Sequence, residues 1–444
     1  MARSIFPILV FLATSLFSIA QTTQTFTADD RHYRDALELF DREKYAAAQK
    51  AFQDYLDLGR SDLLSVEARY YVAVCALYLE NDDAESSIER FIAEYPNHPK
   101  ASVAYYEMGN YYFNRKNTDK AIEYFEKADI PRLTREQQTE AKFKLAYSYF
   151  SKQNFVKAGN LFDELKRSSN KYTFPSSYYA GYCNYRKGNY DEALTDLRRA
   201  AQSPEYAPLV PYMIANVYYK QGRYDELIAY GQTLGATKDI RNADEVFLLV
   251  GEAYYRKGDF VNAAKYLKES VGKSRTKPGP EIAYRLAYAQ YKTGEFKEAA
   301  ENFKITATSA KDTLGQYAAY HMGLSYLQSG NKPFALTAFD QARRGKASKQ
   351  IAEDAAYYHA KLSFETNAGP ETTNLLKDFQ KNHPNSPYRN EINELLSESY
   401  LASNNYNEAV SHIENLPNRT PKIDAAYQRV TFNRGAELFN KDQY

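Results

Sequence analysis

The residues that most often carry chemistry in proteins are few in this chain and lie far apart. There are two cysteines, Cys75 and Cys183, and six histidines: His32, His98, His321, His359, His383 and His412. No histidine has the helical spacing from a second histidine and an acidic residue that a metal site needs. No phosphate-binding loop, nucleophile elbow or dinucleotide fingerprint is present. We therefore expect no catalytic residue, no cofactor and no metal, and two buried thiols that form no disulfide.

The elements that carry these residues are predicted to be helices. The chain has 444 residues, with 42 Tyr and 24 Phe but only 19 Gly and 16 Pro, too few for a turn-rich all-β protein. Lys and Arg number 57 against 56 Asp and Glu, so the formal net charge is +1. This balance argues against wrapping nucleic acid through bulk charge.

Residues 1–20 have the pattern of a cleaved secretory signal peptide. Arg3 supplies a positive start, residues 5–17 are apolar, and Ser18-Ile19-Ala20 is a small-x-small cleavage site before Gln21. An uncleaved membrane anchor is the alternative, but the apolar stretch is short for a bilayer. We expect a short flexible segment at 21–28 and no transmembrane span in the mature chain.

One pattern repeats throughout residues 29–444. A small residue is followed by an aromatic or large apolar residue at +3, Gly or a polar residue at +7, an aromatic at +9, Ala at +12 and a large apolar residue at +16. We call the small residue the marker. The twelve markers are separated by 34 to 39 residues and are Ala36, Cys75, Gly109, Ala146, Gly181, Ala215, Gly251, Ala287, Gly323, Ala360, Ser397 and Gly435.

This spacing resembles that of the tetratricopeptide repeat (TPR) family, whose unit is a helix–turn–helix of about 34 residues. The resemblance implies an all-α, right-handed superhelical solenoid of eleven to twelve hairpins, each with a helix A and a helix B. The marker and the Ala at +12, which we call the second Ala, let the two helices approach closely. Gly at +7 ends helix A in a left-handed conformation. The sixth repeat, with Leu227 and Gly231 in place of the usual sizes, is expected to be distorted or shifted in register.

The last repeat is incomplete, because residues 432–440 read as a helix A and Tyr444 stands where helix B should start. A solenoid needs a polar cap at each end. We expect either a partner on this apolar edge or, preferably, further chain beyond residue 444.

The family resemblance also implies where a partner would bind. In such proteins helix A residues at −3, +1, +4 and +5 from the marker line the inner groove. Here that set is rich in Tyr, and +5 is basic in four consecutive repeats. The competing interpretation is that the tyrosines only pack between A helices. For the cations, the competing interpretation is that they complement the helix dipole. The predicted partner-binding residues are Tyr106, Tyr147, Tyr178, Tyr182, Tyr185, Arg186, Tyr212, Tyr219, Lys220, Tyr255, Arg256, Tyr284, Tyr288, Tyr291, Lys292 and Tyr320.

Charge is uneven along the chain. Residues 29–95 hold 16 acidic and 8 basic residues, whereas residues 166–349 hold 28 basic and 18 acidic ones. Patches of one sign steer partners. Two Pro-rich turns, at 95–99 and 383–387, resemble turns in the periplasmic cell-division coordinator and the outer-membrane assembly lipoprotein of Gram-negative envelopes, although this chain lacks the lipidated Cys of the latter.

Together these features predict a non-catalytic scaffold of the periplasm or outer-membrane periphery that binds protein or peptide partners of the cell envelope. Two alternatives stay open. Tyr-rich grooves can also stack sugars, so the chain could be a glycan- or peptidoglycan-binding module. The repeats could instead be the targeting region of a longer protein with a domain beyond residue 444.

Overall fold

The computed structural model describes residues 28–234, 240–367 and 369–441. The predicted signal peptide and nearly all of the segment at 21–28 therefore lie outside the described residues. Within these ranges the chain forms 23 α-helices and one short 3-10 helix, and contains no strand, which confirms the all-α prediction. None of these helices combines the length and the hydropathy that crossing a bilayer requires.

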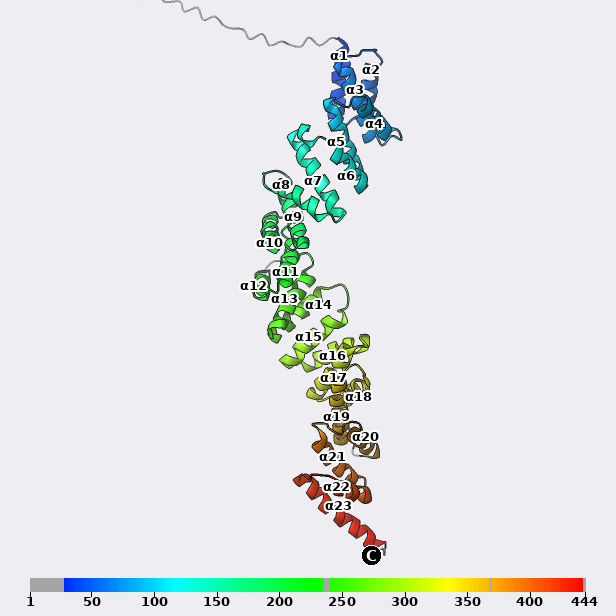
Figure 1. Ribbon diagram of the computed structural model, residues 1–444, viewed down its shortest axis with the longest axis vertical. Coiled ribbons are helices and arrows are strands. Elements are labelled where there is room, and N and C mark those ends of the chain that lie inside the picture. The colour runs from blue at the N-terminus through cyan, green and yellow to red at the C-terminus, as the bar shows by residue number, and fades with distance from the viewer. Residues whose placement is uncertain (1–27, 235–239, 368, 442–444) are drawn as a thin grey trace, which may run out of the picture. The chain divides into compact units, whose positions relative to one another are not determined.

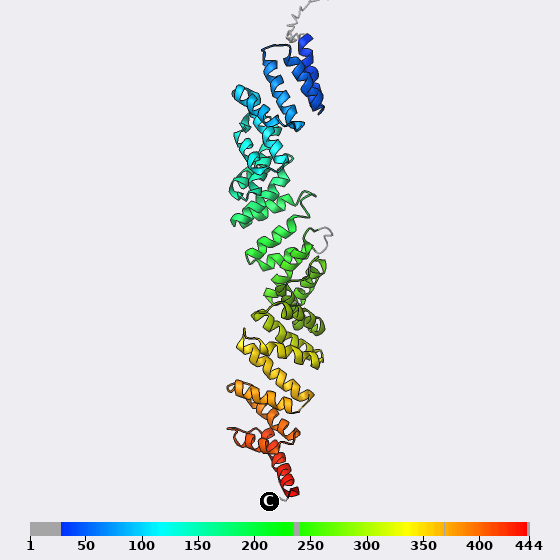
Figure 2. The same ribbon diagram turned by 90° about the vertical axis from the view of Figure 1, so that its right-hand side faces the viewer.

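The helices divide into two compact units, Met1–Lys187 and Gly188–Tyr444. Odd-numbered helices are the A helices and even-numbered ones the B helices; Figures 1 and 2 show them following one another in chain order within each unit. In unit 1 the elements are α1 Ala28–Asp41, α2 Tyr45–Leu56, α3 Leu63–Tyr78, α4 Ala84–Glu94, α5 Pro99–Asn114, α6 Thr118–Lys127, η1 Ile130–Arg132, α7 Arg135–Ser151, α8 Phe155–Lys166 and α9 Thr173–Lys187.

Unit 2 continues the same alternation. Its helices are α10 Tyr190–Ala200, α11 Val210–Lys220, α12 Tyr224–Leu234, α13 Ala243–Lys257, α14 Phe260–Lys273, α15 Pro280–Thr293, α16 Phe296–Ser309, α17 Thr313–Gln328, α18 Lys332–Arg344, α19 Lys349–Thr366, α20 Pro370–Asn382, α21 Arg389–Ala402, α22 Tyr406–Glu414 and α23 Pro421–Asn440. Each Pro-rich turn follows a B helix and precedes an A helix, as the sequence predicts.

The small markers lie where helix A meets helix B most closely. A Cβ added at Gly109 would lie 2.6 Å from the ring of Phe125, and one at Gly323 would lie 2.6 Å from the ring of Phe339. Both phenylalanines are fully buried and stand sixteen residues after their marker. The interval of sixteen residues therefore pairs a small residue on helix A with a large one on helix B. This pairing explains why a large apolar residue follows each of these markers at +16.

The turn from helix A to helix B uses a left-handed residue at +7 in nine repeats. Five of these residues are glycines, with φ between 68° and 85°. At the same position Glu43, Lys116, Gln153 and Asn404 adopt φ values of 57° to 60°. Gly is therefore the most frequent residue at this turn, as expected for positive φ, but the structure accepts a polar residue as well.

The sixth repeat keeps its core with the sizes exchanged. Leu227 occupies the second-Ala position and is fully buried. A Cβ at Gly231 would lie 2.6 Å from Val250 Cγ2 on α13. The large residue thus fills the space within the hairpin, and the glycine lets α12 approach the next A helix.

In several repeats a tyrosine at +3 connects the A helix to the B helix before it. The Tyr149 hydroxyl donates to the carboxylate of Glu126 on α6. Tyr218 accepts from Arg198 on α10 at 2.7 Å, and Tyr254 accepts from Gln232 on α12 at 3.0 Å. A hydroxyl at this position therefore joins neighbouring repeats, which accounts for Tyr rather than Phe there.

The last A helix begins earlier than the sequence indicates. It runs from Pro421 rather than residue 432, because Pro at the first helical position and the Thr420 side chain, which accepts from the Ile423 N–H, start a helix there. Phe432 on this helix is 76% exposed. The marker Gly435 is exposed too, unlike the other eleven markers, because no B helix covers it within the described residues.

Candidate partner-binding surface

All sixteen predicted binding residues lie on A helices, and the structure gives them different exposures. Eleven of the twelve tyrosines are half-buried, and the four basic residues are exposed. Tyr106 differs from the rest: it is 5% exposed and its ring lies 6.4 Å from that of Phe125. It therefore offers almost no surface to a partner.

In unit 1 the predicted positions meet the first residue of a B helix in one cluster. Phe155 begins α8, and its ring lies 5.8 Å from Phe150 and 5.8 Å from Tyr182. The ring of Tyr182 lies 5.1 Å from Phe150. The Arg186 guanidinium carbon stands 5.2 Å from the Phe155 ring centre, a cation–π contact. We call this arrangement an aromatic–cation cluster.

Unit 2 repeats the aromatic–cation cluster with other residues. Phe260 begins α14, and its ring lies 5.6 Å from Tyr255 and 5.7 Å from Tyr288. Lys292 Nζ stands 5.7 Å from the same ring centre. The tyrosines at +1 and +4 thus take part in packing between repeats, as the competing interpretation proposed, and keep part of their surface in water.

A third cluster surrounds Arg256. Its guanidinium carbon lies 5.8 Å from the ring centres of both Tyr219 and Tyr224, and its Nη2 donates to the Tyr219 hydroxyl at 3.4 Å. The acidic residue at +1 in this repeat, Glu252, is 4% exposed and pairs with Arg285. The carboxylate nearest along the helix is therefore already neutralised by another residue.

The four basic residues at +5 have no acidic partner in the part of the chain that the structure describes. Arg186, Lys220, Arg256 and Lys292 each lie in the last turn of an A helix. Over the described residues none of them forms an ion pair, whereas the neighbouring Lys257 pairs with Asp225 at 2.8 Å. The carbonyl end of the helix stabilises each charge, and an aromatic ring holds three of them. Their capacity to bind a carboxylate stays unused.

The sequence analysis missed one residue of the tyrosine surface, His321 on α17. Its ring lies 5.4 Å from Tyr288, 6.0 Å from Tyr291 and 5.5 Å from Tyr320. Its Nδ1 lies 2.9 Å from the Tyr317 carbonyl oxygen. Burial lowers the pKa of His321, so the ring is neutral at pH 7. Its position, two before the marker, is outside the predicted set, and nothing in the sequence singles it out.

The tyrosine hydroxyls on this surface are hydrogen-bond donors at neutral pH. Burial, followed by the charge of Tyr288, raises the pKa of Tyr255 to about 12. Burial also raises the pKa of Tyr284, Tyr291 and Tyr320. A protonated hydroxyl can donate to a carbonyl or a carboxylate of a bound chain.

Other candidate chemistry is absent from the described parts of the chain. They contain no group of three His, Cys, Asp or Glu residues that could hold a metal ion. Both cysteines are free and buried, as predicted, and burial raises the pKa of each thiol to about 12. The thiols are therefore unreactive in the folded protein.

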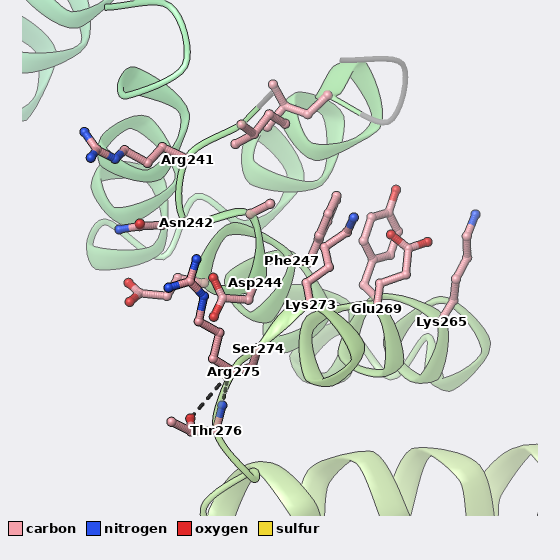
Figure 3. A pocket seen from close by; sticks show the side chains of 15 residues that line it. Arg241, Asn242, Asp244, Phe247, Lys265, Glu269, Lys273, Ser274, Arg275 and Thr276 are labelled. Carbon is pink, nitrogen blue, oxygen red and sulfur yellow. Dashed lines mark hydrogen bonds between the residues drawn. The ribbon is translucent and has the colours of Figure 1, made fainter. Parts of the chain in front are cut away.

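A cavity of about 1260 Å³ lies away from the predicted residues. Figure 3 shows it beside the start of α13 and the end of α14, lined by Arg241, Asp244, Glu269, Lys273 and Arg275 among others. Its lining mixes both charge signs. None of the predicted partner-binding residues lines it.

The alternation of A and B helices and the burial of the markers define a helical-repeat protein. Profiles of the tetratricopeptide repeat match residues 33–81, 67–98, 102–128, 176–205, 212–280 and 251–312. The chain belongs to the tetratricopeptide repeat family. Such repeats generally mediate protein–protein interactions, and scaffolds built from them are generally non-catalytic. No curated protein matches the sequence.

Several solved structures of tetratricopeptide repeat proteins are similar to parts of the chain at low identity. YrrB, described as a TPR protein with an unusual peptide-binding site, is 19% identical over 46% of this chain and 97% of its own, with a TM-score of 0.36. A tetratricopeptide repeat protein from Parabacteroides merdae is 15% identical over 59% and 98%, with a TM-score of 0.34. The C-terminal part of a TPR protein from Cytophaga hutchinsonii is 15% identical over 65% and 98%, with a TM-score of 0.30. These likenesses concern the fold alone.

Proposed function

We propose that this chain is a non-catalytic scaffold of the bacterial cell envelope that binds an extended segment of a partner protein along its A helices. The observation that carries the proposal is the set of four exposed cations at +5, none of which pairs with a carboxylate among the described residues. Cations held in place beside half-buried tyrosines suit a chain that brings carboxylates and carbonyls. The proposed location rests on the signal-like residues 1–20 and on the Pro-rich turns.

A capture experiment with matched variants tests the binding surface. The full chain is used to capture proteins from envelope extracts of a Gram-negative host. The test variant carries Arg186→Gln, Lys220→Gln, Arg256→Gln and Lys292→Gln. The control variant loses four lysines that do have carboxylate partners and carries Lys171→Gln, Lys257→Gln, Lys332→Gln and Lys377→Gln.

We expect one partner to be retained by the wild type and the control and lost by the test variant. Retention should weaken as salt rises, because exposed charge pairs are screened. Equal capture by all three proteins would contradict the proposed surface.

Glycan binding is distinguished by a pelleting assay with isolated peptidoglycan. Sugar stacking needs open ring faces, whereas cations already lie over Phe155 and Phe260. We therefore expect no pelleting. Pelleting that is insensitive to salt and abolished by Tyr182→Ala or Tyr288→Ala would replace the peptide proposal with the glycan alternative.

The proposed location has its own test. The full reading frame is expressed in a Gram-negative host and the product is recovered from the periplasm. We expect an intact mass that begins at Gln21. A cytoplasmic product that retains Met1 would refute the location and leave the binding surface untouched.

A further inference from the structure

Three of the four cations in this surface belong to unit 2 and form a regular row. Lys220, Arg256 and Lys292 are 36 residues apart and occupy the same position in the last turns of α11, α13 and α15. Because their position in the repeat is the same, their spacing follows that of successive A helices. Helix α11 packs against α13, and the rings of Tyr255 and Tyr288 join α13 to α15 at 6.0 Å. Packed helices lie about 8–10 Å apart, so we expect charges at the same repeat position to recur at about that interval.

Among the conformations of a bound peptide, one has a matching period. A polyproline II chain has three residues per turn and rises about 3.1 Å per residue, so every third side chain lies on one face at about 9 Å intervals. A β-strand repeats one face at about 6.6 Å and an α-helix at about 5.4 Å. The polyproline II period fits the row, whereas the shortest same-face repeats of a β-strand and an α-helix are too short for it.

The row has a defined end. At the corresponding position of α17 the residue is Gln328, which carries no charge. Three cations at this interval correspond to three acidic side chains within seven residues of a ligand. The hydroxyl of Tyr255, kept protonated by burial, is available beside the row to donate to the backbone carbonyls that a polyproline II chain leaves exposed.

We propose that Lys220, Arg256 and Lys292 recognise an extended acidic peptide with a carboxylate at every third residue. This inference rests on the proposed function and specifies the ligand of that same surface. The partner is therefore expected to contain a Pro-rich acidic segment. A flexible acidic tail without this spacing would bind more weakly, because aligning its carboxylates with the row costs conformational entropy.

The proposal is tested with the full chain and a labelled peptide of sequence Glu-Pro-Pro-Glu-Pro-Pro-Glu. The comparison peptide has the same composition with its three glutamates adjacent. Fluorescence anisotropy at low and physiological salt gives the two affinities. We expect the spaced peptide to bind about tenfold more tightly, and each of Lys220→Gln, Arg256→Gln and Lys292→Gln to weaken it about threefold to tenfold.

Two further variants make the test specific to position. Lys257→Gln removes a neighbouring cation that pairs with Asp225, and it should leave the affinity unchanged. Gln328→Lys lengthens the row by one charge, and it should favour a ten-residue peptide with a fourth spaced glutamate. Gain of affinity at a designed position cannot result from partial unfolding.

Three outcomes would overturn the inference. These are equal binding of the two peptides, an equal loss with Lys257→Gln, and tighter binding of a sulfated polysaccharide than of the spaced peptide. The capture experiment is independent of this peptide. A partner still retained by the wild type and lost by the four-site variant would leave the proposed function standing while the spacing rule fails.

Discussion

The same repeat position is acidic or neutral in the first four repeats of unit 1 and basic in the first three repeats of unit 2. Five residues after the marker, unit 1 has Asp41, Glu80, Asn114 and Ser151 before Arg186, whereas unit 2 begins with Lys220, Arg256 and Lys292. Glu80 pairs with Arg115 of the next repeat at 2.9 Å. The cations of the row in unit 2 have no such partner among the described residues.

Polar groups on the A helices of unit 1 are also largely paired within that unit. Lys144 Nζ lies 2.6 Å from Glu140 and donates to Asn110 at 2.8 Å, and the Tyr78 hydroxyl donates to Glu107 at 2.7 Å. The two units have the same arrangement of helices and differ in which polar side chains have partners among the described residues. The hairpin therefore fixes the position of each residue, and the chemical identity of the residue decides whether that position can bind a partner.

The largest effect on stability is expected at the buried phenylalanine that both units have at +16. Phe125 in unit 1 and Phe339 in unit 2 are fully buried at the same repeat position. Replacing either by Ala should lower the free energy of unfolding by about 3–5 kcal/mol, because it removes a buried ring and leaves a cavity. Denaturant unfolding followed by circular dichroism measures the loss.

The two phenylalanine variants should differ in their thiol reactivity. Both cysteines are buried in unit 1, and a repeat array propagates disturbance mainly to its neighbours. Reaction with a thiol reagent should therefore accelerate in Phe125→Ala and stay slow in Phe339→Ala. Equal acceleration in both would show that the units open together.

Overpacking should give a smaller loss, again similar in the two units. Gly109→Ala and Gly323→Ala each place a Cβ about 2.6 Å from a buried ring. We expect each to lower the free energy of unfolding by about 1–3 kcal/mol. Gly435→Ala is the control, because nothing lies within 4 Å of its added Cβ, and helix propensity should stabilise it by about 0.5–1 kcal/mol. A neutral effect of both core changes would contradict the close approach of helix A to helix B.

The contribution of the tyrosine contacts between repeats to stability should depend on pH in unit 1 and not in unit 2. In unit 1 a hydrogen bond from Tyr149, followed by one from Lys157, holds the pKa of Glu126 below its usual value of 4.5. This stabilisation is complete above the unfolded pKa and is lost as pH falls through the lowered folded pKa. In unit 2 the partner of Tyr254 is Gln232, which does not titrate.

We therefore expect Tyr149→Phe to cost about 1 kcal/mol at pH 7 and progressively less below pH 4. Tyr254→Phe should cost a similar or smaller amount that is the same at both pH values. Urea unfolding at pH 7 and pH 3 measures the two differences. A cost of Tyr149→Phe that does not change with pH would rule out the assigned carboxylate partner.

The smallest stability effect is expected at the cations. Arg186→Gln and Lys292→Gln each remove an exposed cation–π contact, and each should change the free energy of unfolding by no more than about 0.5 kcal/mol. Thermal unfolding checks this. A larger loss of stability would mean that these residues support the fold. Weaker partner binding by their variants could then no longer be assigned to a lost direct contact.

Much of the fold was predictable because the repeat is a local object. The marker, the second Ala at +12, the aromatic at +9 and the turn residue at +7 all belong to one hairpin, so their spacing reflects contacts within about twenty residues. All eight alanines at +12, from Ala48 to Ala409, are fully buried. The helix ends were less predictable, as the early start of α23 at Pro421 shows.

The candidate surface stays a prediction from the repeat position. Eleven of its twelve tyrosines are half-buried, and Tyr106 is the buried exception. The sequence could not show that Phe155 and Phe260, which begin B helices, join the tyrosines of the following repeat. It could not show His321 among them either. These contacts join residues of different hairpins, and their geometry depends on how one hairpin is set against the next.

The sequence by itself determined the all-helical repeat, its period and the residues at its closest contacts, because a small residue and a large one must alternate wherever two helices of one hairpin touch. Only the tertiary structure decided which polar groups are satisfied. It paired Glu80 and Lys257 with partners in neighbouring hairpins and left Lys220, Arg256 and Lys292 without a carboxylate among the described residues. The physical reason is that ion pairs between repeats depend on the separation and rotation of hairpins, which no spacing within one hairpin encodes.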